Sequence, residues 1–237
     1  MWEHAGHKRS NALVTMLWTL LSLACLYCVF REVASSIVAP PGFDVPRPIY
    51  KPYLVTMVVL AAVFAWPPLH RWHFERFLSD RATELADDHP ARVHCSTMFD
   101  TIFDPEVLAA GHADPRTGRI VIQPPGCSTL SSYLRHPQRA SEHELWSLGL
   151  FTHESMHVRG ELDEARTECE AVQRNYRAAK LLGVPDRIAK QNALEYYRII
   201  YRRRGQLGPM QAQYYSSECA PGKGMDEHLS DSTWADS

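Results

Sequence analysis

One short segment of the sequence has residue types and spacing suited to metal-assisted hydrolysis. His153, Glu154 and His157 form the pattern HExxH. On an α-helix, residues four apart lie on one face about one turn from each other, so both imidazoles can reach a single Zn²⁺ ion at about 2.0–2.1 Å. The ion lowers the pKa of its bound water toward about 7, and Glu154, beside the metal, can accept the proton of that water. The pattern therefore predicts Glu154 as a catalytic base.

A catalytic zinc site needs a third protein ligand and an open position for water. The acidic residues after the pattern offer three candidates, Asp163, Glu164 and Glu168. If the helix ends at Gly160 and the chain reverses, a following helix places Glu164 opposite His157 and Glu168 opposite His153. We therefore predict that Glu164 is the third ligand and that Glu168 accepts the distal N–H of His153. Either of the other two acids as the ligand remains an alternative.

These residues resemble the core of the zincin metallopeptidases. Read from His153 as HExxHxxGxxD, the segment is similar to metzincins, with Gly160 as the turn glycine and Asp163 as the third ligand. Read from Glu164 as ExxTExxA, it resembles the gluzincins, which include thermolysin-like enzymes and membrane-embedded CAAX-type proteases. The gluzincin resemblance implies that Glu164 binds zinc and that Glu168 orients a histidine.

The same segment resembles a set of uncharacterised bacterial membrane-anchored proteins. They share the pattern THESxHxxGxxDEAxxEC and a late SxEC, here Ser217 to Cys219. The likeness covers roughly residues 120–176 and implies a compact zincin-like domain, with no implied substrate.

Local signals predict the elements that position these residues. Ser141 and Glu144 form a capping box, and Gly160 supplies a stop, so a helix is expected from Ser141 to Arg159. Its apolar positions suit a buried helix; they are Leu145, Leu148, Leu150, Phe151 and Met156. Further helices are expected at 129–134, 163–182 and 186–204. The fold class is therefore α+β and mainly helical.

Two short β-type segments precede these helices. ARVHC (91–95) and RIVIQ (119–123) flank the turn-rich GHADPRTG, which predicts a small hairpin or two-strand unit. The zincin resemblance makes RIVIQ the edge strand that precedes the motif helix. The tail from Pro221 is rich in Gly, Ser and Asp, which predicts a mobile segment at 221–237.

The N-terminal part contains two uncharged apolar runs, at 11–30 and 52–69. Each is close to the roughly 20 residues that cross about 30 Å of hydrocarbon as a helix. A cleaved signal peptide is the alternative for the first run, and a buried core helix for the second, whose end carries Pro67 and Pro68. Aromatic residues flank the second run as in a membrane-interface belt; they are Tyr50, Tyr53, Trp66 and Trp72.

We therefore expect a membrane anchor at 1–81 with a lipid bilayer as partner, a metallohydrolase domain at 82–220 and the tail. Residues 70–88 are expected to form a helix that runs along the membrane surface, packs on the domain or links the two. The Lys and Arg residues around the two runs nearly balance, so they do not fix which side the domain faces.

Cysteines and charge add two expectations. We predict a disulfide between Cys169 and Cys219, which would fasten the tail to the ligand helix and place the domain outside the cytoplasm. With Cys95 and Cys127 they make an even set of four in the soluble part, which is compatible with two disulfides outside the cytoplasm or with four thiols inside it. The net charge of −2 shows no basic bias, which excludes nucleic acid as an expected partner.

The sequence thus predicts a membrane-anchored zinc-dependent hydrolase, with a peptide or protein substrate by association with the motif. A non-peptide amide bond is a second candidate substrate. The alternative function is a membrane-tethered binding protein whose metal site is structural or inactive. A tyrosine could stabilise an oxyanion, and the sequence does not choose among five; they are Tyr196, Tyr197, Tyr201, Tyr214 and Tyr215.

Overall fold

A computed structural model describes residues 10–38, 48–97 and 109–235, and residues 1–9, 39–47, 98–108 and 236–237 lie outside the described part. The chain divides into two compact units, Met1–Phe74 and Glu75–Ser237. The division falls before Glu75, whereas the sequence placed it after Arg81. The reason is that the following helical residues Leu78 and Ala82 are fully buried, as part of the second unit.

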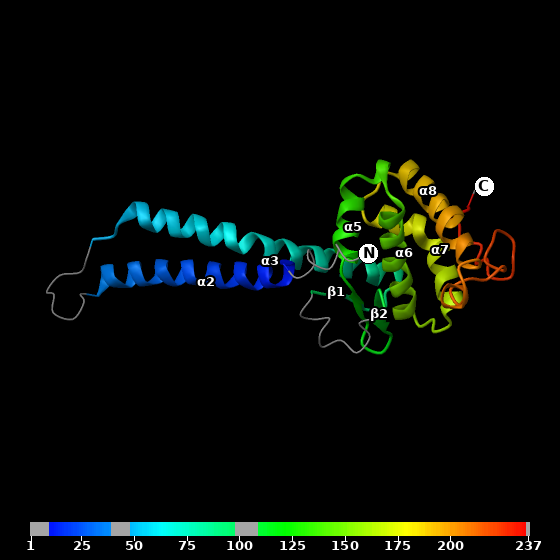
Figure 1. The fold of residues 1–237 in the computed structure, drawn as a ribbon, viewed down its shortest axis with the longest axis horizontal. Coiled ribbons are helices and arrows are strands. Elements are labelled where there is room, and N and C mark those ends of the chain that lie inside the picture. Colours follow the sequence, from blue (N-terminus) through cyan, green and yellow to red (C-terminus); the bar gives the residue numbers. More distant parts are fainter. Residues whose placement is uncertain (1–9, 39–47, 98–108, 236–237) are drawn as a thin grey trace. The chain divides into compact units, whose positions relative to one another are not determined.

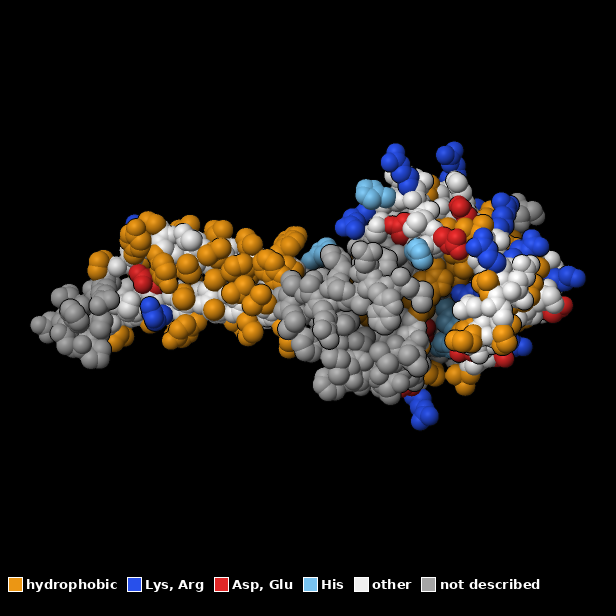
Figure 2. Space-filling view, viewed as in Figure 1, with side chains coloured by type: hydrophobic (Ala, Val, Ile, Leu, Met, Phe, Trp, Pro, Cys, Tyr) orange, Lys and Arg blue, Asp and Glu red, His pale blue; other side chains and the backbone are white. Residues whose placement is uncertain are grey.

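The first unit contains helix α2 (Ser10–Ile37) and the first two thirds of helix α3 (Lys51–Leu85). The two helices run side by side (Figure 1), and the Ser22 hydroxyl donates to the Ala61 carbonyl at 3.0 Å. Both are long and apolar enough to cross a membrane by length and composition. Figure 2 shows hydrophobic side chains over their surface. The runs predicted at 11–30 and 52–69 lie within these helices.

Helix α3 continues without a break through Pro67 and Pro68, and its last turns belong to the second unit. There, three polar side chains one turn apart accept hydrogen bonds from alternate backbone N–H groups of strand β1 (Arg92–Cys95) and the residue before it. The pairs are Glu75 with Cys95, Ser79 with Val93 and Thr83 with Ala91, each at 2.9 Å. Four helical residues rise about 6 Å and two strand residues about 6.6 Å, so the spacings match. The helix thereby supplies hydrogen-bond acceptors for the backbone N–H groups at the outer edge of the sheet.

Among the described residues the sheet has three strands, in the order β1-β3-β2. Strand β2 (Gly111–Asp114) pairs antiparallel with β3 (Arg119–Ile122), and β1 pairs parallel with β3. The expectation that RIVIQ is the edge strand was wrong, because β3 is central. Its Ile120–Ile122 run is buried throughout, as a strand with neighbours on both sides requires.

Eight helical segments follow the sheet in the described residues. Six of them are α5 (Gly126–Arg135), α6 (Glu142–Arg159), α7 (Glu164–Leu181), α8 (Asp186–Glu195), a π-helical segment η2 (Tyr196–Tyr201) and the short α9 (Arg202–Arg204). A 3₁₀ turn, η1 (Pro137–Arg139), and a last turn, α10 (Pro209–Ala212), complete the set. Helix α6 is central, packing on α5, α7, η2 and strands β2 and β3 (Figure 1). The mainly helical class is confirmed, and helices lie where they were predicted, although the one predicted at 186–204 is divided into α8, η2 and α9. The predicted two-strand unit differs from the described sheet, because GHAD, predicted as part of a turn, forms the additional strand β2.

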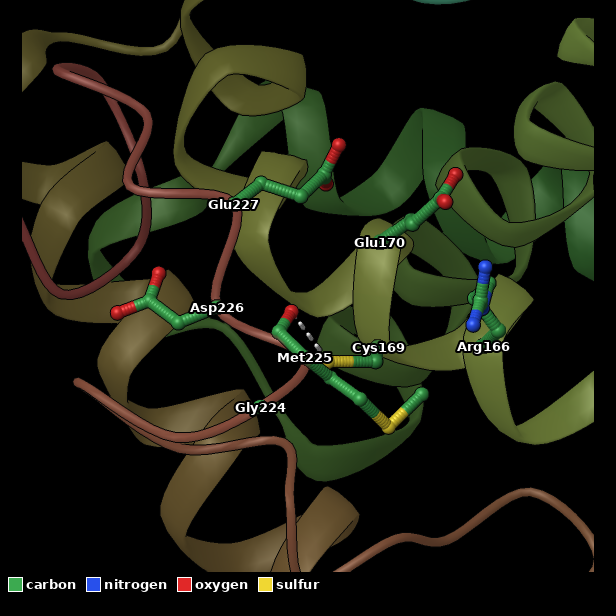
Figure 3. Close-up of a pocket in the computed structure, with 7 residues that line it drawn as sticks. All are labelled: Arg166, Cys169, Glu170, Gly224, Met225, Asp226 and Glu227. Atoms are coloured by element: carbon green, nitrogen blue, oxygen red, sulfur yellow. Dashed lines mark hydrogen bonds between the residues drawn. The ribbon is translucent and has the colours of Figure 1, made fainter.

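The C-terminal tail packs on α7, so the expectation of a mobile segment at 221–237 was wrong for the described residues up to 235. Thr233 and Trp234 are buried, and both guanidinium donors of Arg177 reach the Asp231 carboxylate at 2.6 Å. Tail residues and α7 line a cavity of about 180 Å³ next to Cys169, whose Sγ faces the Met225 carbonyl at 3.7 Å (Figure 3). Composition suggested mobility, but specific ion pairs order this segment.

Two disulfides close the second unit. Cys169 pairs with Cys219, as the sequence predicted, and Cys95 pairs with Cys127, joining the end of β1 to α5. Cys25 and Cys28 in α2 are free thiols.

The contact between α3 and β1 gives a testable prediction. Ser79→Ala should lower the free energy of unfolding by about 1–3 kcal/mol, because the N–H of the buried Val93 loses its acceptor. Urea unfolding of the full chain in detergent, followed by circular dichroism, measures the change. Ser128→Ala is the control, since that exposed hydroxyl donates only within its own helix, to Pro125. Equal losses in both variants would contradict the role given to Ser79.

Candidate metal centre

Helix α6 carries the two histidines, and its ends are fixed by local hydrogen bonds. The Ser141 hydroxyl accepts the Glu144 N–H at 3.3 Å, and the Glu144 carboxylate accepts the Ser141 N–H at 2.8 Å. At the other end Gly160 takes the left-handed conformation, with φ 114°, and its N–H donates to the His157 carbonyl. A glycine at this position stops the helix without a steric cost. The predicted capping box and stop are confirmed.

Helix α7 begins three residues after the reversal. The Asp163 carboxylate accepts the Arg166 N–H at 2.8 Å and is therefore the N-cap of α7. That bond engages Asp163 with the backbone, and the next residue, Glu164, faces α6. Of the three acids considered as the third ligand, Glu164 reaches the Nε2 atoms of both histidines, whereas Glu168 faces Nδ1 of His153.

Three potential ligand atoms from these helices lie within 4.8 Å of one another, one each from His153, His157 and Glu164. The two Nε2 atoms are 3.1 Å apart. The Oε2 atom of Glu164 lies 3.2 Å from Nε2 of His153 and 3.6 Å from Nε2 of His157. This Oε2 atom is buried, and a proton on either imidazole Nε2 would be donated to it.

The other ring nitrogens determine what these atoms can do. Nδ1 of His153 faces the Glu168 carboxylate at 2.9 Å, and Nδ1 of His157 faces the Glu161 carbonyl at 2.8 Å. Because both partners are acceptors, each Nδ1 donates, and a neutral imidazole then carries a lone pair on Nε2. Two lone pairs and a carboxylate oxygen therefore converge on one point, which is unfavourable unless a cation or a proton lies between them.

The spacing of the three atoms fits a tetrahedral ion. Ligands at about 2.0–2.1 Å from zinc in a tetrahedral arrangement lie roughly 3.3–3.4 Å from each other. The observed separations of 3.1, 3.2 and 3.6 Å bracket that value. The donor set of two imidazoles and one carboxylate is also one that zinc accepts, with a fourth position left for water.

The electrostatics of the metal-free residues reflect the same convergence. Burial lowers the pKa of His153, but the carboxylates of Glu164 and Glu168 outweigh it and raise the pKa to about 10. The two histidines in turn lower the pKa of Glu164 to about 2. The residues that could bind a metal therefore also favour a proton between them, and metal binding would compete with protonation.

Glu154 is buried beside the histidines, with 3% of its surface exposed. Its Oε2 atom has no hydrogen-bond partner among the described residues, and burial raises the pKa of the carboxyl to about 7. A methyl group at Gly111, the first residue of β2, would lie 3.0 Å from Oε1 of Glu154. Only a glycine lets the strand approach the carboxylate this closely.

Glu168 holds His153 from behind and is itself held by two donors. The Tyr196 hydroxyl donates to Oε1 of Glu168 at 2.6 Å, and the Arg204 guanidinium lies 3.2 Å from the same oxygen. Burial raises the pKa of Glu168, but Arg204, His153 and Tyr196 together lower it below its ordinary value. The carboxylate therefore stays ionised and fixes the ring of His153.

Space for Tyr196 comes from a glycine on α6. A side chain at Gly149, one turn before His153, would meet the Tyr196 ring at 2.4 Å. Tyr196 is also the first residue of the π-helical segment η2. A π-helical turn shifts the side-chain directions of a helix and is frequent near functional sites.

Tyr214 is the tyrosine that faces the metal centre. Its ring lies edge-on to the ring of His153, with centroids 5.7 Å apart, and the Arg204 guanidinium stacks on it at 5.2 Å. Burial and then the carboxylate of Glu164 raise the pKa of Tyr214. Its hydroxyl is therefore in the field of the site, and the side chain is only half-buried.

Comparisons with protein families, with characterised proteins and with solved structures found no match to this chain. The residues and their geometry are therefore the basis of any functional inference.

The structure brings together the residues singled out in the sequence, His153, Glu154, His157, Glu164 and Glu168. Sequence reasoning did not choose Tyr214 among the five tyrosines and did not single out Arg204. It also missed Gly111 and Gly149. The signal available for Gly149 was its position inside a predicted helix, where glycine is unfavourable without a packing reason; Gly111 lies in a segment predicted as a turn, which gave no such signal.

The network behind His153 gives a second prediction. Tyr196→Phe should weaken zinc binding by about 10-fold or more, because Glu168 loses a donor and no longer holds His153 as firmly. Competition with a chelating dye measures the affinity. Tyr133→Phe is the matched control, since Tyr133 is equally buried and its hydroxyl accepts from Asn192 instead. A loss of affinity of the same size in the control would show a general packing effect.

Proposed function

We propose that this chain is a membrane-anchored zinc-dependent hydrolase that cleaves peptide bonds with metal-activated water. The observation that carries the proposal is the convergence of His153, His157 and Glu164 on one point, with the unpartnered carboxylate of Glu154 beside it. Zinc bound there would lower the pKa of a water molecule and polarise the substrate carbonyl.

The chain's own residues supply the remaining steps. Glu154 accepts the proton of the attacking water and passes it to the leaving amine, since its Oε2 atom is buried and has no other described partner. Glu168 keeps His153 in one tautomer and orientation. Tyr214 donates its hydroxyl proton in a hydrogen bond to the oxyanion that develops on the substrate carbonyl.

Two features support a peptide as the substrate. The HExxH segment resembles those of zincin peptidases, and strand β2 begins at Gly111, directly against Glu154. Within the described sheet β2 is an outer strand, and an outer strand can pair with an extended polypeptide. An extended substrate on that strand would pass the catalytic carboxylate.

Membrane attachment and sidedness have separate support. The exposed surfaces of α2 and the first part of α3 are apolar over lengths that span a bilayer. All four cysteines of the second unit are in disulfides, whereas both in α2 are free. Disulfides persist in oxidising compartments, which favours an extracytoplasmic position for the second unit.

The alternative of a membrane-tethered binding protein with a structural or inactive metal site has less support. Structural zinc sites are usually closed by four protein ligands, whereas the described residues provide three. A structural site also has no need of a buried, unpartnered carboxylate beside it.

Substitution of the proposed base tests the hydrolase function. Glu154→Gln should retain about one zinc ion per chain and lower zinc-dependent peptide hydrolysis by at least about 100-fold, because the general base is lost. Metal analysis and cleavage of a peptide library by the full chain measure the two properties. Glu164→Ala should lose both, whereas Asp163→Ala, which removes only a helix cap, should retain zinc. Full activity in Glu154→Gln would defeat the mechanism.

Tyr214 is tested by removal of its hydroxyl alone. Tyr214→Phe should lower kcat by about 10- to 1,000-fold and leave KM and zinc affinity nearly unchanged, because the hydroxyl acts mainly in the transition state. Tyr215→Phe is the neighbouring control, since that ring packs on Tyr201 instead. A rise in KM without a fall in kcat would assign Tyr214 to substrate binding.

A further inference from the structure

Large apolar side chains that are mainly exposed are rare in the described part of the second unit. They are Leu162, Leu207 and Met210, with 70%, 58% and 82% of their surfaces exposed. Single exposed apolar residues are normal on proteins, but a set confined to one region marks an interaction site. Whether these three residues mark an interaction site therefore depends on where they lie relative to the candidate metal centre.

Each of the three lies close in the chain to a residue of the metal centre. Leu162 is two residues before Glu164, Leu207 three after Arg204 and Met210 four before Tyr214. Because a residue spans at most about 3.6 Å, each Cα atom lies within roughly 14 Å of a residue at the centre. Large exposed apolar side chains thus occur, in the described second unit, only on the two segments that bring Glu164 and Tyr214 to the site.

The backbones of both segments are held in place. The Glu161 carboxylate accepts the N–H groups of Leu162 and Asp163, both at 2.9 Å. In the other segment, the N–H groups of Gln211 and Ala212 donate to the Gly208 carbonyl, forming the turn that carries Met210. The apolar side chains are therefore presented to solvent from ordered turns, which reduces the entropy lost on binding.

We infer that Leu162, Leu207 and Met210 form an apolar rim that binds a large apolar side chain of an extended polypeptide near the scissile bond. The inference rests on the proposed function and gives it a substrate class, namely unfolded segments with leucine-like or phenylalanine-like residues.

The neighbours of the rim favour a polypeptide over a lipid surface. Three exposed glutamines alternate with the apolar residues of the second segment; they are Gln206, Gln211 and Gln213. Amide side chains donate and accept hydrogen bonds as peptide groups require, whereas inserting them among acyl chains would be unfavourable. The segments that carry these apolar residues also carry Glu164 and Tyr214, which likewise favours a polypeptide that reaches the candidate metal centre.

Binding of two matched probe peptides tests the rim. The full-length Glu154→Gln chain, loaded with zinc in lipid nanodiscs, is titrated into fluorescent heptapeptides that differ only by leucine or serine at the centre. The leucine peptide should bind about 10-fold tighter or more, since one leucine-sized side chain leaves water. Fluorescence polarisation, corrected with empty nanodiscs, gives the ratio.

The rim variant carries Leu162→Ser, Leu207→Ser and Met210→Ser in the same chain, and its ratio should fall below about threefold. The control carries Gln206→Ser, Gln211→Ser and Gln213→Ser and should keep the full ratio. Equal binding of the two peptides, absence of binding, or an unchanged ratio in the rim variant would each overturn the inference.

The proposed function is judged separately, by zinc-dependent hydrolysis of a peptide library by the wild-type chain. Hydrolysis without a leucine preference in the binding experiment would support the hydrolase function and contradict the proposed role of the rim. A rim-dependent preference without hydrolysis would leave an apolar peptide-binding surface beside an inactive metal site.

Discussion

A carboxylate that stays ionised inside a protein needs donors around it, and Glu168 imposes that requirement on the second unit. Leaving such a charge unpaired would cost several kcal/mol, so its partners have to converge on it. They come from three different elements: His153 from α6, Tyr196 from the π-helical segment and Arg204 from α9. The hydrogen bond between Glu168 and Nδ1 of His153, which joins two of these elements, also sets the tautomer of His153. Its Nε2 atom then faces the carboxylate of Glu164, and the packing requirement and the metal centre are one arrangement.

Signals that act over a few residues were readable from the sequence. The capping box at Ser141, the stop at Gly160 and the four-residue spacing of the histidines each fix local geometry through backbone hydrogen bonds or helix periodicity. The reversal between α6 and α7 is short enough that these local rules also place Glu164 and Glu168. For that reason the five residues singled out in the motif region come together, and the helices of the second unit lie close to where they were expected.

Interactions between distant parts of the chain were not readable in the same way. Nothing local to Tyr196 or Arg204 indicates that they face Glu168, nor does anything local to Tyr214 indicate that it faces His153, because a π-helical turn and a long connection decide their directions. The central position of β3 depends on its parallel pairing with β1, from which it is separated in the sequence by β2. The order of the tail depends on arginines of α7, whereas its composition of Gly, Ser and Asp is typical of mobile segments.

The packing of the tail bears on the order in which the second unit folds. Thr233 donates its N–H to the Gln173 carbonyl, and its hydroxyl bonds to the Val172 carbonyl 61 residues earlier in the chain. Until that long loop closes, Arg177 lacks Asp231 and this face of α7 remains open to water. Because the entropy of closing a long loop is lost before the contacts form, completion of this face is expected to be a late step of folding, after the local turns of α7.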